Sequence, residues 1–276
     1  MRGTILYGPR DVRFEECDVP RLIKPTDAII RISATCVCGS DLWPYRGISP
    51  VSEPTPMGHE YCGIVEETGS EVRTIKPGQF VIGSFFVSDN TCPHCRAGYQ
   101  SSCEHRESVG GAQAPLLRLP FADGTLVTTP NVPSDDLIPS LLALSDVMGT
   151  GWFAAVAANV KPGKPVAVVG DGAVGLLGVL SAKQMGAERI IAMSRHESRQ
   201  KLAREFGARC LVLGRYSGPL SIRVCANRRM SSGSTRKTPG GGVSDVGRSI
   251  RRSPSSIDGT VPTSPFRRLY TRCSSA

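Results

Sequence analysis

One short segment constrains the fold of this chain more than any other, the glycine-rich run at residues 170–175. It reads Gly-Asp-Gly-Ala-Val-Gly, follows a Val-rich stretch at 165–169 and opens a helical stretch at 173–185. In this context Gly170 permits a tight turn, Gly172 lets the backbone approach a pyrophosphate, and Gly175 lets the helix pack against the strand. We therefore predict that these three glycines bind a dinucleotide. The alternative is a glycine-rich turn without a ligand.

The residues around this motif alternate between strand and helix patterns. Strands are expected at 165–170, 189–193 and 210–213, and helices at 140–158, 173–185 and 198–206. Such alternation predicts a parallel sheet of the Rossmann type, here with only two or three of its strands.

The preceding part of the chain has a different pattern. Short apolar runs at 28–34, 63–67 and 79–83 are separated by Gly and Pro, as in many short strands joined by turns. This pattern predicts a β-barrel domain. The predicted organisation is a β-barrel catalytic domain at 1–145, a truncated α/β dinucleotide-binding domain at 146–213, and a tail at 214–276.

The residues after the second strand of the α/β part bear on the choice of cofactor. NAD-binding folds place an acid about twenty residues after the motif, where it binds the ribose 2′-hydroxyl. Ser194 and Arg195 stand there instead, and arginine pairs well with a phosphate. We therefore predict that Ser194 and Arg195 bind the cofactor and that NADP(H) is preferred over NAD(H). The alternative is that Arg195 is a solvated surface residue.

Two segments of the β-rich part carry zinc-ligand chemistry. Cys38 is followed by Ser40 and Asp41, and His59 and Glu60 come about twenty residues later. Thiolate and neutral imidazole bind zinc, and zinc with an open position acidifies an alcohol oxygen. Ser40 is placed to take the alcohol proton, and Asp41 and Glu60 to orient His59 or approach the metal. Taken singly, Cys38 and His59 are better explained as a buried cysteine and a core histidine whose hydrogen bonds are satisfied.

These motifs together resemble the zinc-containing medium-chain alcohol dehydrogenases. The run Gly58-His59-Glu60-Tyr61-Cys62-Gly63, with Gly69 and Val72 beyond it, is similar to the signature of that family, and residues 38–41 resemble its first zinc-ligand segment. Residues 146–152 resemble the segment that supplies a third ligand, and that position falls on Asp146. The likeness covers residues 1–213. It implies a GroES-like catalytic domain joined to a Rossmann domain, with the active site between them.

The same resemblance implies a second, structural zinc. The family holds it with four cysteines, of which this chain has Cys92, Cys95 and Cys103, with Asp89 at the first position. A carboxylate oxygen can replace a thiolate, so a site of Asp89 and three cysteines is expected. His94 and His105 are alternative ligands, and a loop that packs without metal is the other possibility.

The positive charge of the chain is concentrated in its last quarter. Residues 214–276 carry a net charge of +10 and the remainder about −1, within a total of +9. This Ser- and Arg-rich segment has no strand–helix rhythm, and we expect it to be disordered or read out of frame. A basic tail that binds nucleic acid is the less favoured reading, because few aromatic residues accompany its arginines.

The expected function is hydride transfer between an alcohol, aldehyde or ketone and NADP(H) at a zinc site. The alternative is a non-catalytic zinc-binding remnant of such an enzyme. No apolar run is long enough to cross a membrane and no secretion signal stands at the start, so a cytoplasmic protein with reduced cysteines is expected. The resemblance also implies homo-oligomers, as is common in the family.

Overall fold

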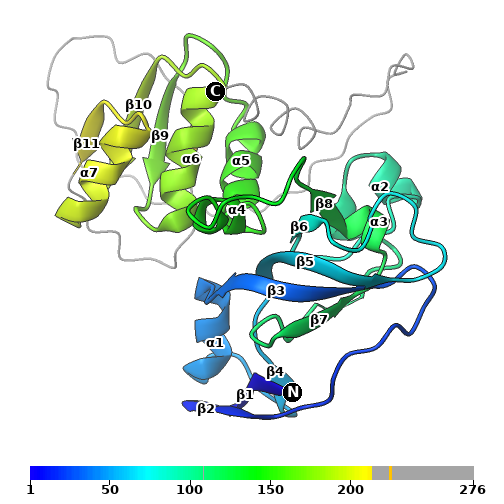
Figure 1. Ribbon diagram of the computed structural model, residues 1–276. Coiled ribbons are helices and arrows are strands. Elements are labelled where there is room, and N and C mark those ends of the chain that lie inside the picture. The colour runs from blue at the N-terminus through cyan, green and yellow to red at the C-terminus, as the bar shows by residue number, and fades with distance from the viewer. Residues whose placement is uncertain (108, 213–223, 226–276) are drawn as a thin grey trace, which may run out of the picture. The chain divides into compact units, whose positions relative to one another are not determined.

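The computed structural model describes residues 1–107, 109–212 and 224–225 (Figure 1). The tail prediction for residues 214–276 therefore lies outside the described residues, except at Val224–Cys225. The boundary predicted at 145/146 stays a prediction, since all described residues belong to one unit, Met1–Asn227.

The first part of the chain forms two antiparallel sheets. A three-stranded sheet has the order β2-β1-β4, and a five-stranded sheet has the order β7-β3-β5-β6-β8. The strands are β1 (Arg2–Gly8), β2 (Asp11–Glu16), β3 (Ala28–Cys36), β4 (Thr55–Pro56), β5 (Glu60–Thr68), β6 (Phe80–Gly83), β7 (Leu116–Leu119) and β8 (Leu126–Thr128). Short helices lie between them: η1 (Gly39–Asp41), α1 (Leu42–Tyr45), α2 (Pro93–Arg96), η2 (Gln100–Ser102), α3 (Ala122–Thr125) and α4 (Ile138–Leu142).

The core of the five-stranded sheet forms because β-branched, aromatic and aliphatic side chains of neighbouring strands meet on its faces. One cluster of buried residues joins side chains of β3, β5, β6, β7 and β8, among them Ile30, Tyr61, Val65, Val81 and Leu119. The register of β3 against β5 shifts twice, between Ile29 and Ile30 and between Ile32 and Ala34. The pairing nevertheless continues to Cys36 opposite Glu60, so the ends of these two strands bring residues 38 and 59 together.

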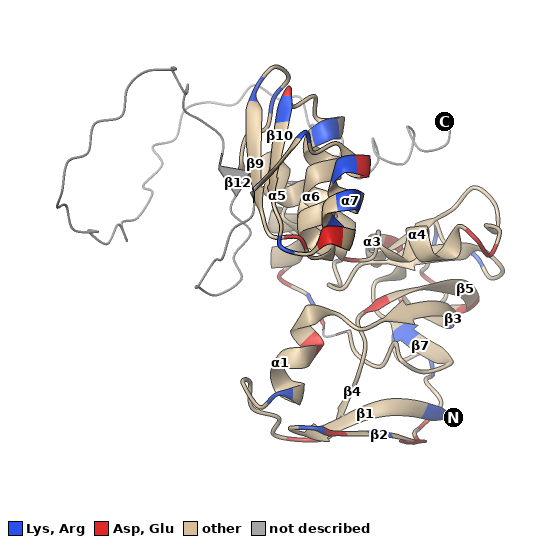
Figure 2. Ribbon diagram, turned by 90° about the vertical axis from the view of Figure 1, so that its left-hand side faces the viewer, with Lys and Arg blue, Asp and Glu red and all other residues tan. Residues whose placement is uncertain are grey.

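The second part is an α/β layer. Its sheet has the order β11-β10-β9-β12, built from β9 (Pro165–Val169), β10 (Arg189–Met193), β11 (Cys210–Val212) and β12 (Val224–Cys225). The strands β9, β10 and β11 are parallel, as predicted. The helices α5 (Val147–Ala157), α6 (Ala173–Gln184) and α7 (Glu197–Phe206) lie beside this sheet (Figures 1 and 2), with α6 in contact with β9, β10, α5 and α7.

This architecture confirms the predicted fold class, and two local expectations were wrong. A single helix was expected over 140–158, but the chain forms α4 and α5 with a break at Ser145 and Asp146. The Ser145 hydroxyl donates to the Leu142 carbonyl, and Asp146 has φ −144° and ψ −69°, which are not helical values. No strand was expected beyond residue 213, but β12 pairs antiparallel with β9.

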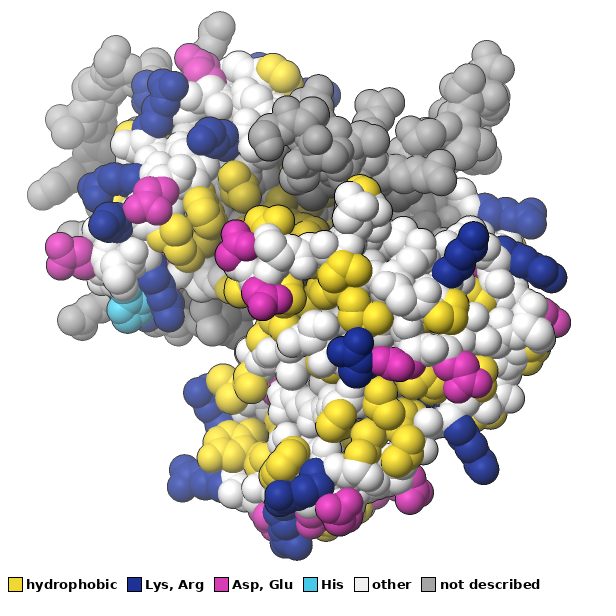
Figure 3. All heavy atoms as spheres, in the orientation of Figure 1, with side chains coloured by type: hydrophobic (Ala, Val, Ile, Leu, Met, Phe, Trp, Pro, Cys, Tyr) yellow, Lys and Arg dark blue, Asp and Glu magenta, His cyan; other side chains and the backbone are white. Residues whose placement is uncertain are grey.

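The surface of the described part mixes charged and apolar side chains, as one face shows in Figure 3. Within residues 1–107, 109–212 and 224–225, none of the helices has the length and apolar character needed to span a bilayer.

Candidate metal and dinucleotide sites

The position of Cys38 is set by the turn that follows β3. Cys38 caps the helix η1 with extended backbone angles, φ −81° and ψ 157°. Its backbone N–H donates to Asp41 Oδ2 at 2.9 Å, which closes the turn on itself. The thiol is thereby held just beyond the end of the strand.

His59 enters the same region from the start of β5. Gly58 has a φ of +97°, and a Cβ there would lie 2.8 Å from the backbone N of Gln113, so only glycine fits this approach. The His59 ring then lies between two polar partners: Nδ1 is 3.3 Å from Asp41 Oδ1, and Nε2 is 3.5 Å from Ser40 Oγ. The single carboxylate of Asp41 therefore fixes both the Cys38 turn and the His59 ring.

Asp146 comes from the break between α4 and α5. The Thr150 hydroxyl, one turn later on α5, donates to Asp146 Oδ1 at 2.7 Å. The other carboxylate oxygen, Oδ2, lies 3.7 Å from Cys38 Sγ and 3.6 Å from His59 Nε2. One ligand atom from each of Cys38, His59, Glu60 and Asp146 lies within 4.8 Å of the others. Four predicted site residues from distant segments thus meet at one point.

The chemistry of this cluster fits a zinc ion. Donors on one tetrahedral zinc lie about 3.3–3.8 Å apart, given metal–ligand bonds of about 2.0–2.3 Å, and the separations of Asp146 Oδ2 from Cys38 Sγ and His59 Nε2 lie in this range. Hydrogen bonds to Asp146, Asp41 and Cys38 raise the pKa of His59 to about 12. Burial alone would raise the pKa of Asp146, but His59 and Thr150 together hold it below its usual range. The carboxylates of Asp146 and Asp41 therefore favour positive charge at this point, which a bound metal cation would supply.

Glu60 lies behind this cluster. Its side chain is buried, with 2% of its surface exposed, and its Oε2 accepts a hydrogen bond from Cys36 Sγ at 3.1 Å. Burial is the main cause that raises the pKa of Cys36 to about 12, so this thiol stays protonated. The Cys36 thiol therefore acts as a hydrogen-bond donor that holds the Glu60 side chain in place.

A second cluster contains the residues expected to hold structural zinc. Ligand atoms of Asp89, Cys92, Cys95 and Cys103 lie within 4.8 Å of one another, and the three cysteines are free thiols with 3–4% of their surface exposed. Cys103 Sγ is 3.4 Å from Asp89 Oδ1 and 4.0 Å from Cys92 Sγ. Hydrogen bonds from the backbone N–H groups of Glu104 and Cys95 lower the pKa of Cys92 to about 7, which favours a thiolate.

His94 and His105, the alternative zinc ligands in the lobe formed by residues 89–105, have other partners. His105 Nδ1 is 2.7 Å from Asp89 Oδ2, so it contacts the carboxylate from outside the cluster. His94 Nδ1 is 2.8 Å from the Ser102 carbonyl oxygen. Asp89 Oδ1 also accepts from the backbone of Thr91 at 2.9 Å, and such outer contacts orient a ligand carboxylate.

The glycine-rich loop has the geometry that its sequence predicts. Gly170 has a φ of +116°, Gly172 caps α6 with no atom within 4 Å of the place of a Cβ, and a Cβ at Gly175 would lie 2.3 Å from the Gly170 carbonyl oxygen. The backbone N–H groups that begin α6 are thus open to an anion, as dinucleotide binding requires.

Asp171, between the first two glycines, contacts the turn after β10. Its Oδ2 accepts from Ser194 Oγ at 2.9 Å and from the backbone N–H of Arg195 at 3.1 Å, and its Oδ1 lies 3.2 Å from Arg199 Nη1. Ser194 is buried, with 1% of its surface exposed, whereas Arg195 is exposed. The Ser194 hydroxyl is thus committed to Asp171, and its contact with a cofactor stays a prediction.

Several contributors were missed by sequence reasoning. Phe85 packs its ring edge-on to His59, with ring centroids 6.4 Å apart. Thr150 was recognisable only as the residue four positions after Asp146 on one helix. The contact between Asp171 and Arg199 depends on how the loop after β9 approaches the start of α7, which no local sequence pattern indicates.

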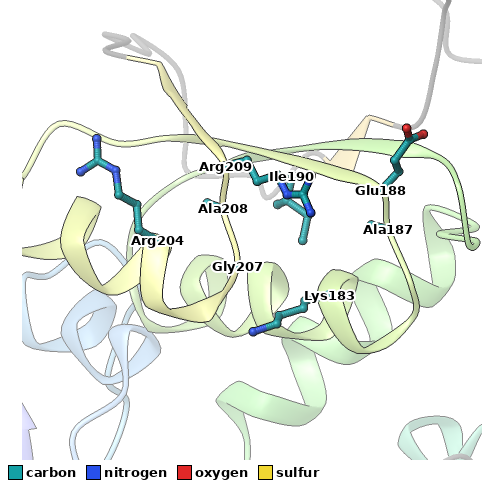
Figure 4. Close-up of a pocket in the computed structure, with 8 residues that line it drawn as sticks. All are labelled: Lys183, Ala187, Glu188, Ile190, Arg204, Gly207, Ala208 and Arg209. Atoms are coloured by element: carbon teal, nitrogen blue, oxygen red, sulfur yellow. The ribbon is translucent and has the colours of Figure 1, made fainter.

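A separate cavity of about 260 Å³ lies where α6 and α7 end and β10 begins (Figure 4). Lys183, Glu188, Arg204 and Arg209 are among its lining residues. None of the predicted site residues lines it.

The comparisons with known proteins agree with this geometry. Residues 24–141 match the alcohol dehydrogenase GroES-like domain. A medium-chain reductase/dehydrogenase of Acremonium sp is 36% identical over 77% of this chain, and zinc-type alcohol dehydrogenase B of Aspergillus flavus is 34% identical over 75%. The solved alcohol dehydrogenase of Thermus sp. ATN1 superposes with a TM-score of 0.70 at 33% identity over 77% of this chain.

The chain therefore belongs to the zinc-type medium-chain alcohol dehydrogenase family. Membership of this enzyme family supports zinc and a nicotinamide as cofactors. The chain spans 76% of the Acremonium relative, 50% of the Aspergillus relative and 63% of the Thermus structure.

Proposed function

We propose that this protein oxidises an alcohol, or reduces the corresponding aldehyde or ketone, with a nicotinamide cofactor at a zinc site formed by Cys38, His59 and Asp146. The observation that carries the proposal is the meeting of a thiol, an imidazole and a carboxylate within 4.8 Å. Zinc held there would supply a Lewis acid that lowers the pKa of an alcohol hydroxyl or polarises a carbonyl.

The surrounding residues position the ligands and move the proton. Asp41 holds the His59 ring through Nδ1, so Nε2 is left to face the metal position. Thr150 fixes one oxygen of Asp146 and leaves the other toward Cys38 and His59. The exposed Ser40 hydroxyl, 3.5 Å from His59 Nε2, receives the proton of an alcohol and passes it to water. Glu60 adds a second carboxylate within 4.8 Å of the three proposed ligands.

The glycine-rich loop is the proposed cofactor site. The open N–H groups at the start of α6 bind the pyrophosphate beside Gly170, Gly172 and Gly175. Arg195, exposed after β10, binds the ribose 2′-phosphate of NADP(H), and Ser194 supports that turn from beneath. The nicotinamide, when bound, would accept or deliver the hydride.

The second cluster is proposed to hold structural zinc through Asp89, Cys92, Cys95 and Cys103. Three buried thiols and one carboxylate are a closed set of four donors, which is typical of structural rather than catalytic zinc.

Apolar alcohols are the proposed substrate class. Phe85 beside His59, with Phe86 packed edge-on to Phe85, gives the cluster aromatic neighbours, and apolar side chains with few polar groups are typical of small-molecule pockets.

The test combines metal analysis, cofactor binding and turnover on the purified full chain. We expect two zinc ions per chain by mass spectrometry, binding of NADPH by fluorescence titration, and oxidation of a primary alcohol. Cys38→Ser and Asp146→Asn should each lose one zinc and at least about a hundredfold of the activity. Cys103→Ser should lose the other zinc.

Cys210→Ser is the matched control, because Cys210 is an exposed free thiol in β11. It should keep both metals and full activity. Zinc binding without NADPH binding would instead identify a metal-binding protein without catalysis and would overturn the proposed enzyme.

A further inference from the structure

Asp171 belongs to the glycine-rich loop in the sequence, but its side chain contacts the turn after β10. The region after β10 was expected to have no carboxylate, because Ser194 and Arg195 stand where NAD-binding folds place an acid. The structure brings a carboxylate there from the other loop, because Asp171 Oδ2 contacts Ser194 Oγ and the Arg195 backbone N–H. The ribose end of the proposed site thus contains an acid and arginine together.

The hydrogen bonds around Asp171 keep it charged. Burial alone would raise the pKa of the Asp171 carboxyl, but donors on Arg195, Ser194, His196 and Arg199 together hold it below its usual range. Its side chain is 16% exposed, whereas that of its partner Arg199 is 49% exposed. The carboxylate is therefore fixed, and the arginine is the partner free to move.

The surrounding charges make this ion pair relevant to an anionic ligand. In α7, three basic residues, Arg199, Lys201 and Arg204, lie between Glu197 and Glu205, and basic and acidic side chains are both seen on this helix in Figure 2. Arg199, the first of the three, is the one that pairs with Asp171. A phosphate bound by Arg195 and Arg199 would compete with Asp171 for the charge of Arg199, and it would be repelled by the same carboxylate.

We propose that Asp171 is a specificity-determining positioning residue, which orders the turn at Ser194–His196 and limits the preference of the site for a 2′-phosphate. This inference rests on the proposed function, because it needs the adenosine half of the cofactor to bind here. The glycine-rich loop thereby sets the cofactor preference as well as the pyrophosphate position.

The experiment compares two adenosine nucleotides that differ only in the 2′-phosphate, 2′,5′-ADP and 5′-AMP, by isothermal titration calorimetry on the full chain. Asp171→Asn keeps an oxygen that can accept from the Ser194 hydroxyl and the Arg195 N–H but removes the charge. We expect it to raise the preference for 2′,5′-ADP about threefold or more, with little change for 5′-AMP.

Two further variants separate charge from structure. Ser194→Ala loosens the same turn without changing its charge, and Glu188→Gln removes an exposed charge just before β10, at the far end of that strand. Glu188→Gln should leave both affinities unchanged. Ser194→Ala alters the site without changing its charge, so it should change the affinities for both nucleotides by the same factor and leave their ratio as it is in the wild type. Thermal unfolding by circular dichroism should show that every variant is folded. An unchanged or lower preference in Asp171→Asn overturns the inference, as does an equal rise in either comparison variant.

The two proposals fail separately in this design. If the wild-type chain binds both nucleotides but lacks zinc or turnover, the proposed function fails. The role of Asp171 is then still tested by comparing the preference for 2′,5′-ADP over 5′-AMP between the wild type and Asp171→Asn. If the wild-type chain binds neither nucleotide, the role of Asp171 is overturned with the cofactor site.

Discussion

At the scale of single residues, the buried carboxylate of Asp27 joins two segments of the β-rich part, the turn before β3 and the strand β7. Its side chain is fully buried, and its Oδ2 accepts from Arg118 Nε at 2.7 Å and from the backbone N–H groups of Ile23 and Lys24 at 2.9 and 2.8 Å. Burial alone would raise the pKa of Asp27, but these hydrogen bonds hold it below its usual range.

We predict that Asp27→Asn lowers the free energy of unfolding at pH 7 by about 2 kcal/mol, because a neutral amide replaces the buried carboxylate that accepts from Arg118 and from two backbone N–H groups. The wild-type carboxylate stabilises the fold above its unfolded-state pKa of about 3.9, and this contribution is lost as pH falls through its lower folded-state pKa. Urea unfolding between pH 2.5 and 7 should therefore show a weaker acid dependence in the variant.

Asp11→Asn is the comparison for this prediction. Asp11 also pairs with an arginine, Arg13, but both side chains are exposed, and exposed ion pairs contribute little to stability. A loss of stability in Asp11→Asn as large as that in Asp27→Asn would contradict the explanation.

The residues of the candidate metal site were predictable to the extent that they lie in motifs. The family motifs identified Cys38, His59 and Asp146 as candidate zinc ligands, and the structure brings these three side chains together. The roles of Thr150 and Phe85 were not predictable, because the first depends on the break before α5 and the second on the path of the chain after β6.

At the scale of elements, the helix α6 contains two glycines with different surroundings. A Cβ at Gly175 would lie 2.3 Å from the Gly170 carbonyl oxygen, whereas the nearest atom to a Cβ at Gly178 is Val168 Cγ1 at 3.9 Å. The first glycine is required by helix–loop packing, and the second has space for a methyl group.

We predict opposite effects of alanine at these two positions. Gly175→Ala should lower the free energy of unfolding by about 1–3 kcal/mol, because the backbone of the loop must shift. Gly178→Ala should raise it by up to about 1 kcal/mol, because alanine favours the helix. Urea denaturation of both variants tests this, and equal effects of the same sign would refute the packing argument.

Elements with a strong pattern were predicted almost to the residue. The strand expected at 189–193 is β10, and the helix expected at 198–206 is α7 with one further residue. The break between α4 and α5 was missed because the apolar residues on both sides of Ser145 and Asp146 were interpreted as one continuous helical face. The hydrogen bond from Ser145 to Leu142, which ends α4, appears only in the folded chain.

At the scale of the whole molecule, the two donor clusters link metal content to stability. The lobe around α2 has a small core made of Cys92, Cys95 and Cys103, so few apolar contacts hold it. The cluster of Cys38, His59 and Asp146 joins the β-rich part to the start of α5 through Cys38 and Asp146. Any ion bound only by the folded state therefore stabilises the fold.

We predict that removing metal with a chelator lowers the melting temperature by several degrees and that added zinc restores it. An ion present at one hundred times its dissociation constant contributes about 2.7 kcal/mol per site. Differential scanning calorimetry measures the shift. Cys103→Ser should show a smaller shift than wild type, whereas Cys210→Ser should match wild type. No shift in the wild-type protein would rule out a stabilising metal.

The two donor sets also differ in how far apart they lie along the chain. All four donors of the second cluster lie within residues 89–103, so this segment can enclose an ion while the protein is still being synthesised. Cys38, His59 and Asp146 meet only after the five-stranded sheet has paired and α5 has begun. During biogenesis the lobe would thus acquire its metal first, and the reactive centre would stay without metal until the surrounding sheet has formed.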